Sequence, residues 1–192
     1  AAARSAEVRR QIIGGAPSIS ALVARFGDFE DGRFLAIGDN RHVFYSEDLC
    51  KSWKHSRIPE GVGDRGQEVI AFGNNIFVCS FKDKAARSLD GGATWTLHDH
   101  GGKRASWRGL SFVNGEFWLT NWNGGGRRSK DGATWEDLPP QTPAGRFVQS
   151  PKGTIINVAR GRYDVKRSGD GKNWETVFKA PALAANQKDV TW

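Results

Sequence analysis

The stretch "RSLDGGATWTL", Arg87–Leu97, decides the fold of this chain because it returns three more times in the same order. The related stretches "YSEDLCKSW", "RSKDGATW" and "RSGDGKNW" end at Trp53, Trp135 and Trp174. Together with Trp95, these tryptophans follow one another at intervals of 42, 40 and 39 residues. A constant period near 40 residues indicates a protein built from repeated structural units.

Each repeat contains four short segments that alternate in polarity or are apolar throughout. In the second repeat they are "EVIAFG", "IFVCSF", "AARSLD" and "WTLHDH", and the other repeats divide in the same way. Turns such as "FGNN", "VNGE" and "SPKG" predict β-hairpins, and no segment has a sustained helical period. Four-stranded antiparallel units at this period are typical of a β-propeller. The sequence therefore predicts an all-β propeller with four complete blades, at about residues 18–58, 66–100, 107–139 and 145–180.

The two ends of the chain resemble further strands. "AAARS" at the start is similar to "KAARS" of the second repeat, and "NQKDVTW" at the end reads as a first strand. We expect residues 1–13 and 186–192 to form a partial fifth blade that closes the ring, since closure removes exposed strand edges. The alternative is an open arc, a fragment of a larger propeller that other sequence or a partner chain completes.

The recurring box has a structural interpretation, because it falls between the third and fourth strands of each repeat. There an Asp accepts several backbone N–H groups, a Ser or Thr adds a local hydrogen bond, a Gly supplies positive φ and a Trp covers the turn. We expect these residues to fasten the fold, since an active site is not needed four times around a ring. The residues with this structural role are Ser46, Asp48, Trp53, Ser88, Asp90, Gly92, Thr94, Trp95, Ser129, Asp131, Thr134, Trp135, Ser168, Asp170 and Trp174.

At these residues the chain resembles a known family. "SLDGGATW", Ser88–Trp95, is similar to the Asp-box, or BNR repeat, of sialidases and sialidase-like propellers. The other copies depart from it: Cys50 replaces a Gly in the first, the third and fourth are one residue shorter, and Asn173 replaces Thr in the fourth. The same box occurs in sialidases, xyloglucan-degrading enzymes, sorting receptors, photosystem assembly factors and non-enzymatic glycan binders. The resemblance therefore implies the propeller fold and a functional face away from the boxes.

The catalytic residues of sialidases have few counterparts here. That family uses three arginines, a Tyr nucleophile paired with a Glu, and an Asp as acid/base. Tyr45 adjoins a box serine and is expected to pack in the fold, which leaves Tyr163 as the sole nucleophile candidate, without a Glu near it in sequence. The string "SRIP", Ser56–Pro59, follows the first box and lacks the Phe of the family motif. We expect a non-catalytic protein, with a sialidase-like glycoside hydrolase as the alternative.

Ligand binding is predicted at the end of the propeller opposite the boxes, where connections between second and third strands meet those between blades. These connections combine Arg, Asn and aromatic side chains, which suit stacking on sugar rings and bidentate binding of a carboxylate. We expect a glycan or polysaccharide, acidic ones included; a protein-binding scaffold of the assembly-factor or sorting-receptor type is a further alternative. The predicted ligand residues are Arg41, Arg104, Trp107, Asn121, Trp122, Asn123, Arg160, Arg162 and Tyr163.

Composition limits the remaining function classes. The formal net charge of +7 is spread along all 192 residues, which either favours an acidic partner or only keeps the surface solvated. No apolar run approaches the roughly 20 residues of a membrane span, and no nucleic-acid reading element is present. "HDH", His98–His100, is expected to be solvated. We therefore expect no cofactor, no metal site, no membrane span and no nucleic-acid partner.

Cysteine usage and the absence of Met bear on the compartment. Cys50 and Cys79 are the only cysteines, which excludes a disulfide-dense scaffold and leaves either one bridge or two separate thiols. No Met occurs, even at position 1, which a removed leader or an excised domain would explain. We expect a secreted, extracellular or periplasmic protein.

Overall fold

The computed structural model describes residues 19–24, 33–62, 69–81, 83–101, 107–121, 123–158 and 164–179. These residues form four antiparallel sheets of four strands each, and within every sheet the strands follow chain order. The predicted all-β class and the four-stranded units are thereby confirmed. In this part of the chain, no helix has the length and apolar character needed to cross a membrane.

Each sheet is formed by one continuous stretch of the chain. The first sheet consists of β1 (Ile19–Ala24), β2 (Phe34–Gly38), β3 (His42–Ser46) and β4 (Lys54–Arg57), with the 3-10 helix η1 (Asp39–Arg41) between β2 and β3. The second consists of β5 (Val69–Gly73), β6 (Ile76–Ser80), β7 (Lys84–Ser88) and β8 (Thr96–Asp99). The third consists of β9 (Trp107–Val113), β10 (Glu116–Asn121), β11 (Gly126–Ser129) and β12 (Glu136–Asp137). The fourth consists of β13 (Arg146–Gln149), β14 (Ile155–Val158), β15 (Val165–Ser168) and β16 (Glu175–Phe178).

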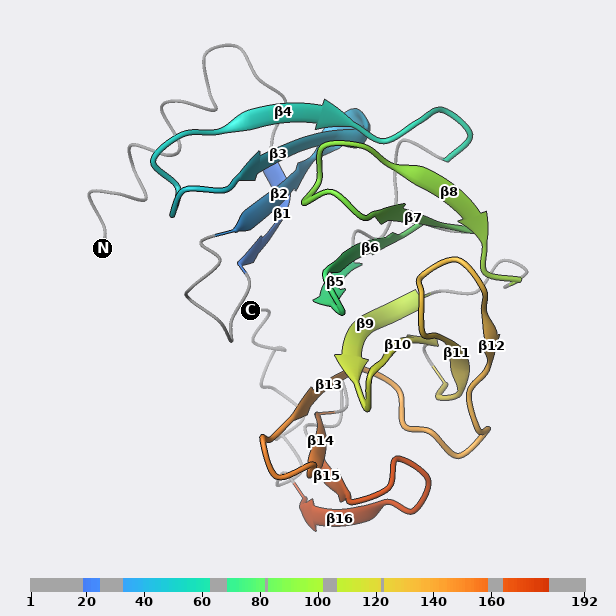
Figure 1. Ribbon diagram of the computed structural model, residues 1–192. Coiled ribbons are helices and arrows are strands. Elements are labelled where there is room, and N and C mark those ends of the chain that lie inside the picture. Colours follow the sequence, from blue (N-terminus) through green and yellow to red (C-terminus); the bar gives the residue numbers. More distant parts are fainter. Residues whose placement is uncertain are drawn as a thin grey trace, which may run out of the picture.

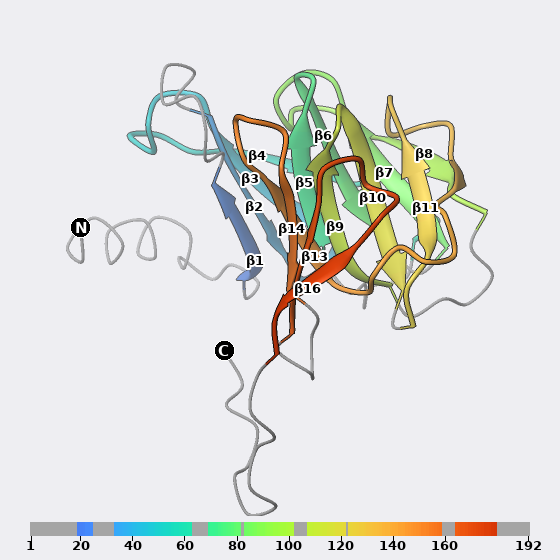
Figure 2. The ribbon, with the colours of Figure 1, turned by 90° about the horizontal axis from the view of Figure 1, so that it is seen from below.

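The four sheets follow one another along an arc, with β1, β5, β9 and β13 innermost and β4, β8, β12 and β16 outermost (Figure 1). Seen from below, the second and third sheets lie face to face (Figure 2). The described strands make four separate sheets and no closed one. The predicted fifth blade from residues 1–13 and 186–192 lies outside the described residues.

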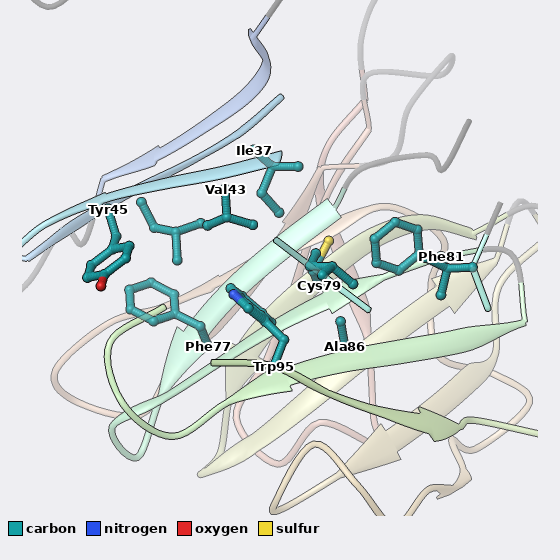
Figure 3. Packing of buried hydrophobic residues seen from close by; sticks show 11 residues of the cluster. Ile37, Val43, Tyr45, Phe77, Cys79, Phe81, Ala86 and Trp95 are labelled. Atoms are coloured by element: carbon teal, nitrogen blue, oxygen red, sulfur yellow. The ribbon is translucent and has the colours of Figure 1, made fainter. Parts of the chain in front are cut away.

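The core lies between successive sheets, because strand side chains alternate between two faces. On β6, Phe77 and Cys79 face the first sheet and Val78 faces the third. The cluster between the first two sheets places Tyr45 and other apolar side chains of β2 and β3 over β6 and over Trp95 (Figure 3). The two inner sheets are therefore buried on both faces.

Tyr45 and Cys79 are both buried in this first cluster. The expected packing of Tyr45 is thus confirmed. Cys50 is half-buried in the first turn, and no disulfide joins it to Cys79. The sequence had left either a bridge or two thiols, and the structure has two thiols.

The recurring turn lies between the third and fourth strands of each sheet, and one carboxylate holds it together. In the second turn, Asp90 Oδ1 accepts the Thr94 N–H at 2.8 Å and Asp90 Oδ2 accepts the Thr94 hydroxyl at 2.6 Å. Ser88 Oγ donates to Asp90 at 2.9 Å and accepts the Gly92 N–H at 2.8 Å. The other turns repeat the bond from serine to aspartate in the pairs Ser46–Asp48, Ser129–Asp131 and Ser168–Asp170.

Departures from the sequence pattern preserve these hydrogen bonds. In the first turn Ser52 Oγ donates to Asp48 Oδ2 at 2.6 Å, and in the fourth Asn173 Nδ2 donates to Asp170 Oδ2 at 2.7 Å. Both replace the threonine hydroxyl of the second turn. In the first turn, Cys50 stands at the position that Gly92 has in the second. Its N–H donates to Ser46 Oγ at 3.0 Å, and its φ is +63°. The first turn therefore keeps the conformation at the cost of backbone strain.

The turn also packs on the preceding sheet. The Trp95 side chain is 6% exposed, and its Nε1 donates to the Gly92 carbonyl at 3.0 Å. Ser56 Oγ of the first sheet donates to the same carbonyl at 2.5 Å. Gly92 has a φ of +103°, and a Cβ built on it would lie 2.7 Å from Leu35 Cδ1. Glycine adopts this φ without strain and leaves room for the close approach between the turn and the first sheet.

Hydrogen bonding keeps the turn carboxyls ionised. The Ser52 hydroxyl, followed by its N–H, holds the pKa of Asp48 far below its ordinary value, and the N–H of Asn173 does the same for Asp170. At Asp90, burial acts to raise the pKa, but the combined hydrogen bonds of the turn outweigh burial and the pKa is lowered. These carboxyls therefore bind protons less readily in the folded chain than in the unfolded one.

Replacing the turn residues should destabilise the fold. We expect Trp95→Ala to lower the free energy of unfolding by roughly 3 to 5 kcal/mol, because it leaves a cavity between two sheets. Asp90→Ala should lower it by roughly 1 to 3 kcal/mol, because the N–H of Thr94 loses its acceptor. Leu89→Ala is the matched control, since the Leu89 side chain in the same turn is 61% exposed. Urea denaturation followed by circular dichroism measures all three, and an Asp90→Ala variant as stable as the parent would contradict the fastening role.

Acid should also destabilise the fold. A carboxyl whose pKa is lower in the folded state contributes stability above its unfolded pKa of about 4, and that stability is lost as the pH falls toward the folded value. We expect the free energy of unfolding to decrease below about pH 4, and to decrease less in Asp48→Asn, which keeps an acceptor oxygen but does not titrate. Urea denaturation at several values between about pH 7 and pH 3 measures the two slopes. Equal slopes would show that Asp48 is not responsible.

Candidate functional site

The antiparallel order of the strands gives the sheets two distinct ends. The four aspartate turns lie at one, here called the turn end. The connections between second and third strands, and those from one sheet to the next, lie at the other, here called the loop end. Of the predicted ligand residues, Arg41, Asn121 and Asn123 lie on described segments at the loop end.

Arg41 lies at the loop end of the first sheet, but its side chain is only 9% exposed. Its Nη2 lies 3.7 Å from Glu60 Oε1, and its carbonyl accepts the Ile58 N–H at 3.0 Å. Its backbone has a φ of +68°. The residue thus ties η1 to the connection that follows β4, and little of its side chain is left for a ligand.

Asn121 and Asn123 lie at the loop end of the third sheet. The N–H of Asn123 donates to Asn121 Oδ1 at 3.0 Å, so that Asn121 shapes the loop while the Asn123 side chain is exposed. The glycines that follow have packing roles: the Gly125 N–H donates to the Thr142 carbonyl at 2.7 Å, and a Cβ on Gly126 would lie 2.0 Å from the Leu119 carbonyl oxygen. Close backbone packing therefore accounts for the glycines of "NWNGGG".

His100 corrects one sequence-based expectation. The sequence predicted solvated histidines in "HDH", whereas the His100 side chain is fully buried. Its Nε2 lies 3.2 Å from the Phe81 carbonyl oxygen, its ring meets Trp135 edge-on, and its own carbonyl accepts a bond from Arg127 Nε. Burial lowers the pKa of His100. The residue fills the junction between the second and third sheets, which no local pattern indicated.

His98 and the acidic groups do not assemble into a metal centre. His98 Nε2 lies 2.9 Å from Thr96 Oγ1, and Asp99 pairs with Lys84 at 2.8 Å on the surface. Among the residues that the structure describes, no three His, Cys, Asp or Glu side chains are grouped to hold a metal ion.

The side chains of the remaining predicted ligand residues are not among those that the structure describes. Trp107 is described only as the first backbone position of β9. These six residues therefore stay predicted ligand residues: Arg104, Trp107, Trp122, Arg160, Arg162 and Tyr163.

The sequence analysis missed two cavities at the turn end, each of about 350 Å³. They occupy equivalent places on the third and fourth sheets. One is lined by Arg128, Ser129 and Glu136, the other by Arg167, Ser168 and Glu175, among others. In both, the arginine pairs with the glutamate of the next strand. Because the cavity recurs with the repeat, we assign it to the repeat and not to a single specific site.

Comparisons with known proteins are informative at the level of structure. No protein-family model matches the chain, and no curated protein matches it. The solved structure of YCF48 bound to D1 peptide superposes with a TM-score of 0.60 at 19% identity, covering 83% of this chain and 56% of that one. A virginiamycin B lyase from Staphylococcus aureus gives 0.64 at 15% identity, covering 86% of this chain and 56% of the lyase.

The GH74 enzyme of Niastella koreensis gives a TM-score of 0.53 at 20% identity, covering 76% of this chain and 22% of the enzyme. This chain thus spans just over half the length of the YCF48 and lyase chains. At these identities the likeness concerns the fold alone. Four successive four-stranded sheets and these neighbours show that the chain has a β-propeller type of fold.

Proposed function

We propose that the chain is a non-catalytic recognition module that binds a polypeptide partner at the loop end of its sheets. The contrast between the two ends carries this proposal. All four turns share one hydrogen-bond pattern, whereas the connections at the loop end differ from one another. In the first sheet the connection is the 3-10 helix η1, in the second the Phe81 N–H donates to the Lys84 carbonyl across a tight loop, and in the third the loop after Asn121 is rich in glycine. Repetition at one end supports the fold, and variation at the other end supplies specificity.

The chemistry of the described loop residues suits a polypeptide. Glu60, Asp83 and Asn123 are exposed at the loop end, and their hydrogen-bonding groups suit backbone amides. The shared fold of YCF48 bound to D1 peptide supports the same class of partner.

We further infer that the four turns are Asp-boxes of the sialidase-like type and that the four sheets are successive propeller blades. The shared serine-to-aspartate and N–H-to-aspartate bonds support this assignment. A glycan ligand and a hydrolase activity depended on Trp122, Arg160, Arg162 and Tyr163, which lie outside the described residues. Those two functions stay predictions.

Loop-end substitutions should weaken binding without loss of stability. We expect Asp83→Ala combined with Asn123→Ala to weaken binding of the partner about thirtyfold, because two lost hydrogen bonds of roughly 1 kcal/mol each remove roughly 2 kcal/mol of binding free energy. The melting temperature should not change, since both side chains are exposed. Candidates come from affinity capture on the immobilised chain, and isothermal titration of the purified partner measures the dissociation constant.

The control pair is Lys130→Ala with Lys172→Ala, two exposed residues at the turn end. Equal loss of affinity in both double variants would contradict binding at the loop end. Binding of a purified acidic polysaccharide, with no polypeptide bound, would contradict the proposed class of partner and favour the glycan.

A further inference from the structure

One contact recurs at all three junctions between sheets. In each sheet, the residue directly before the turn serine lies on the third strand and pairs with a residue of the second strand. We call this pair of residues the seat. The seats of the first three sheets are Leu35–Tyr45, Val78–Arg87 and Trp118–Arg128. Each seat lies under the turn of the following sheet.

The glycine of the following turn approaches each seat more closely than any other residue could. A Cβ on Gly132 would lie 2.5 Å from Val78 Cγ2, and a Cβ on Gly171 would lie 2.6 Å from Trp118 Cη2. The equivalent distance from Gly92 to the first seat is 2.7 Å. Real Cβ atoms essentially never approach so closely, and the φ values of these glycines, between +73° and +103°, strain any other residue, so each junction favours glycine at this place in the turn. The seat arginine adds a polar contact in the second sheet, where Arg87 Nη1 donates to the Asp131 carbonyl at 3.2 Å.

The fourth sheet has the same seat on its outward face. Ile156 pairs with Arg167, which directly precedes the turn serine Ser168. The opposite face packs on the third sheet, where Phe147 is 5% and Ile155 0% exposed. The sheet thus repeats the arrangement that receives a turn in the other three.

The outward face of the fourth sheet exposes several apolar side chains. Val148 pairs with Ile156, Val158 pairs with Val165, and Val165 pairs with Phe178. Because residues that pair across neighbouring strands lie on the same face of a sheet, these side chains share one face. Val148, Val158 and Phe178 are 67%, 51% and 53% exposed. Arg167 is 54% exposed and contacts Glu175. An exposed apolar sheet face of this kind is characteristic of an interaction surface.

We propose that this seat docks one further four-stranded sheet of the same repeat type, belonging to a partner polypeptide, whose turn places a glycine on Ile156. Continuity with the three junctions inside the chain indicates the type of sheet that fits this face, since repeat units bury their faces only against neighbouring units. The first sheet of a second copy fits less well, because its turn has Cys50 where the others have glycine. The seat is distinct from the loop end, so this inference does not depend on the proposed function.

The probe is the chain's own second sheet, covalently attached. A copy of residues 69–100 replaces residues 187–192, which leaves 179–186 as a connection of the same length as 138–145. The variant Val158→Cys, made together with Cys50→Ser, places a thiol on the outward face. The rate at which this thiol is labelled measures whether the face is covered. We expect labelling to be at least tenfold slower in the extended chain than in the unextended one, and the amides of the attached copy to be protected from hydrogen exchange.

Two controls separate docking at the seat from other effects. Gly92→Val in the attached copy should restore fast labelling, because a side chain there cannot approach Ile156, and Ile156→Lys in the fourth sheet should do the same. Equal labelling with the glycine and valine copies would overturn the proposal. Absence of protected amides in the attached copy would also overturn the proposal. The same sequence folds when it packs on the first sheet, so it should fold on the fourth sheet if the seat is equivalent. Slow labelling of the unextended chain would also overturn the proposal, because the face would then already be covered. A labelling rate that depends on protein concentration would indicate cover by a second copy, and a rate that does not would indicate cover by the chain's own residues.

Discussion

Each sheet of this protein depends on one aspartate carboxylate that accepts the N–H groups of a tight turn. Asp90 shows the arrangement: its two oxygens hold the N–H and the hydroxyl of Thr94, while Ser88 joins the carboxylate to the end of β7. This local bonding fixes the position of Gly92 and Trp95, which contact the preceding sheet. A hydrogen bond within one turn thus determines how two sheets pack.

The same constraint separates the two ends of the molecule. In the turns, serines, aspartates and tryptophans of the kinds found in catalytic or ligand-binding sites instead make the hydrogen bonds and packing contacts that hold the fold. At the loop end, several residues with similar chemistry also support packing: His100 is buried between sheets, and Arg41 holds its own connection. In the part of the chain that the structure describes, the loop end exposes polar side chains such as Glu60, Asp83 and Asn123 on connections that differ from sheet to sheet. A partner would therefore be distinguished by the connections, while the turns remain the same.

Stacking of repeats leaves outer faces that differ from the inner ones. The second and third sheets are covered on both sides, and the fourth exposes valines and Phe178 on a face that has the residues of a seat. In such an architecture stability comes from each unit and from its junctions with its neighbours. The exposed seat therefore has a cost in stability that a further unit would remove.

The sequence by itself determined the repeat, the four strands in each unit and the chemistry of the turn, because these depend on residues only a few positions apart. Even the departures at Ser52 and Asn173 keep the local hydrogen bonds. Only the tertiary structure decided which side chains are available to solvent. The sequence indicated a solvated His100, but Phe81 and Trp135, from other segments, bury it. Arg41 was a predicted ligand residue, but its side chain is only 9% exposed and lies beside Glu60 of the connection after β4. Burial and exposure depend on contacts between segments far apart in the chain, and a local pattern contains no information about those contacts.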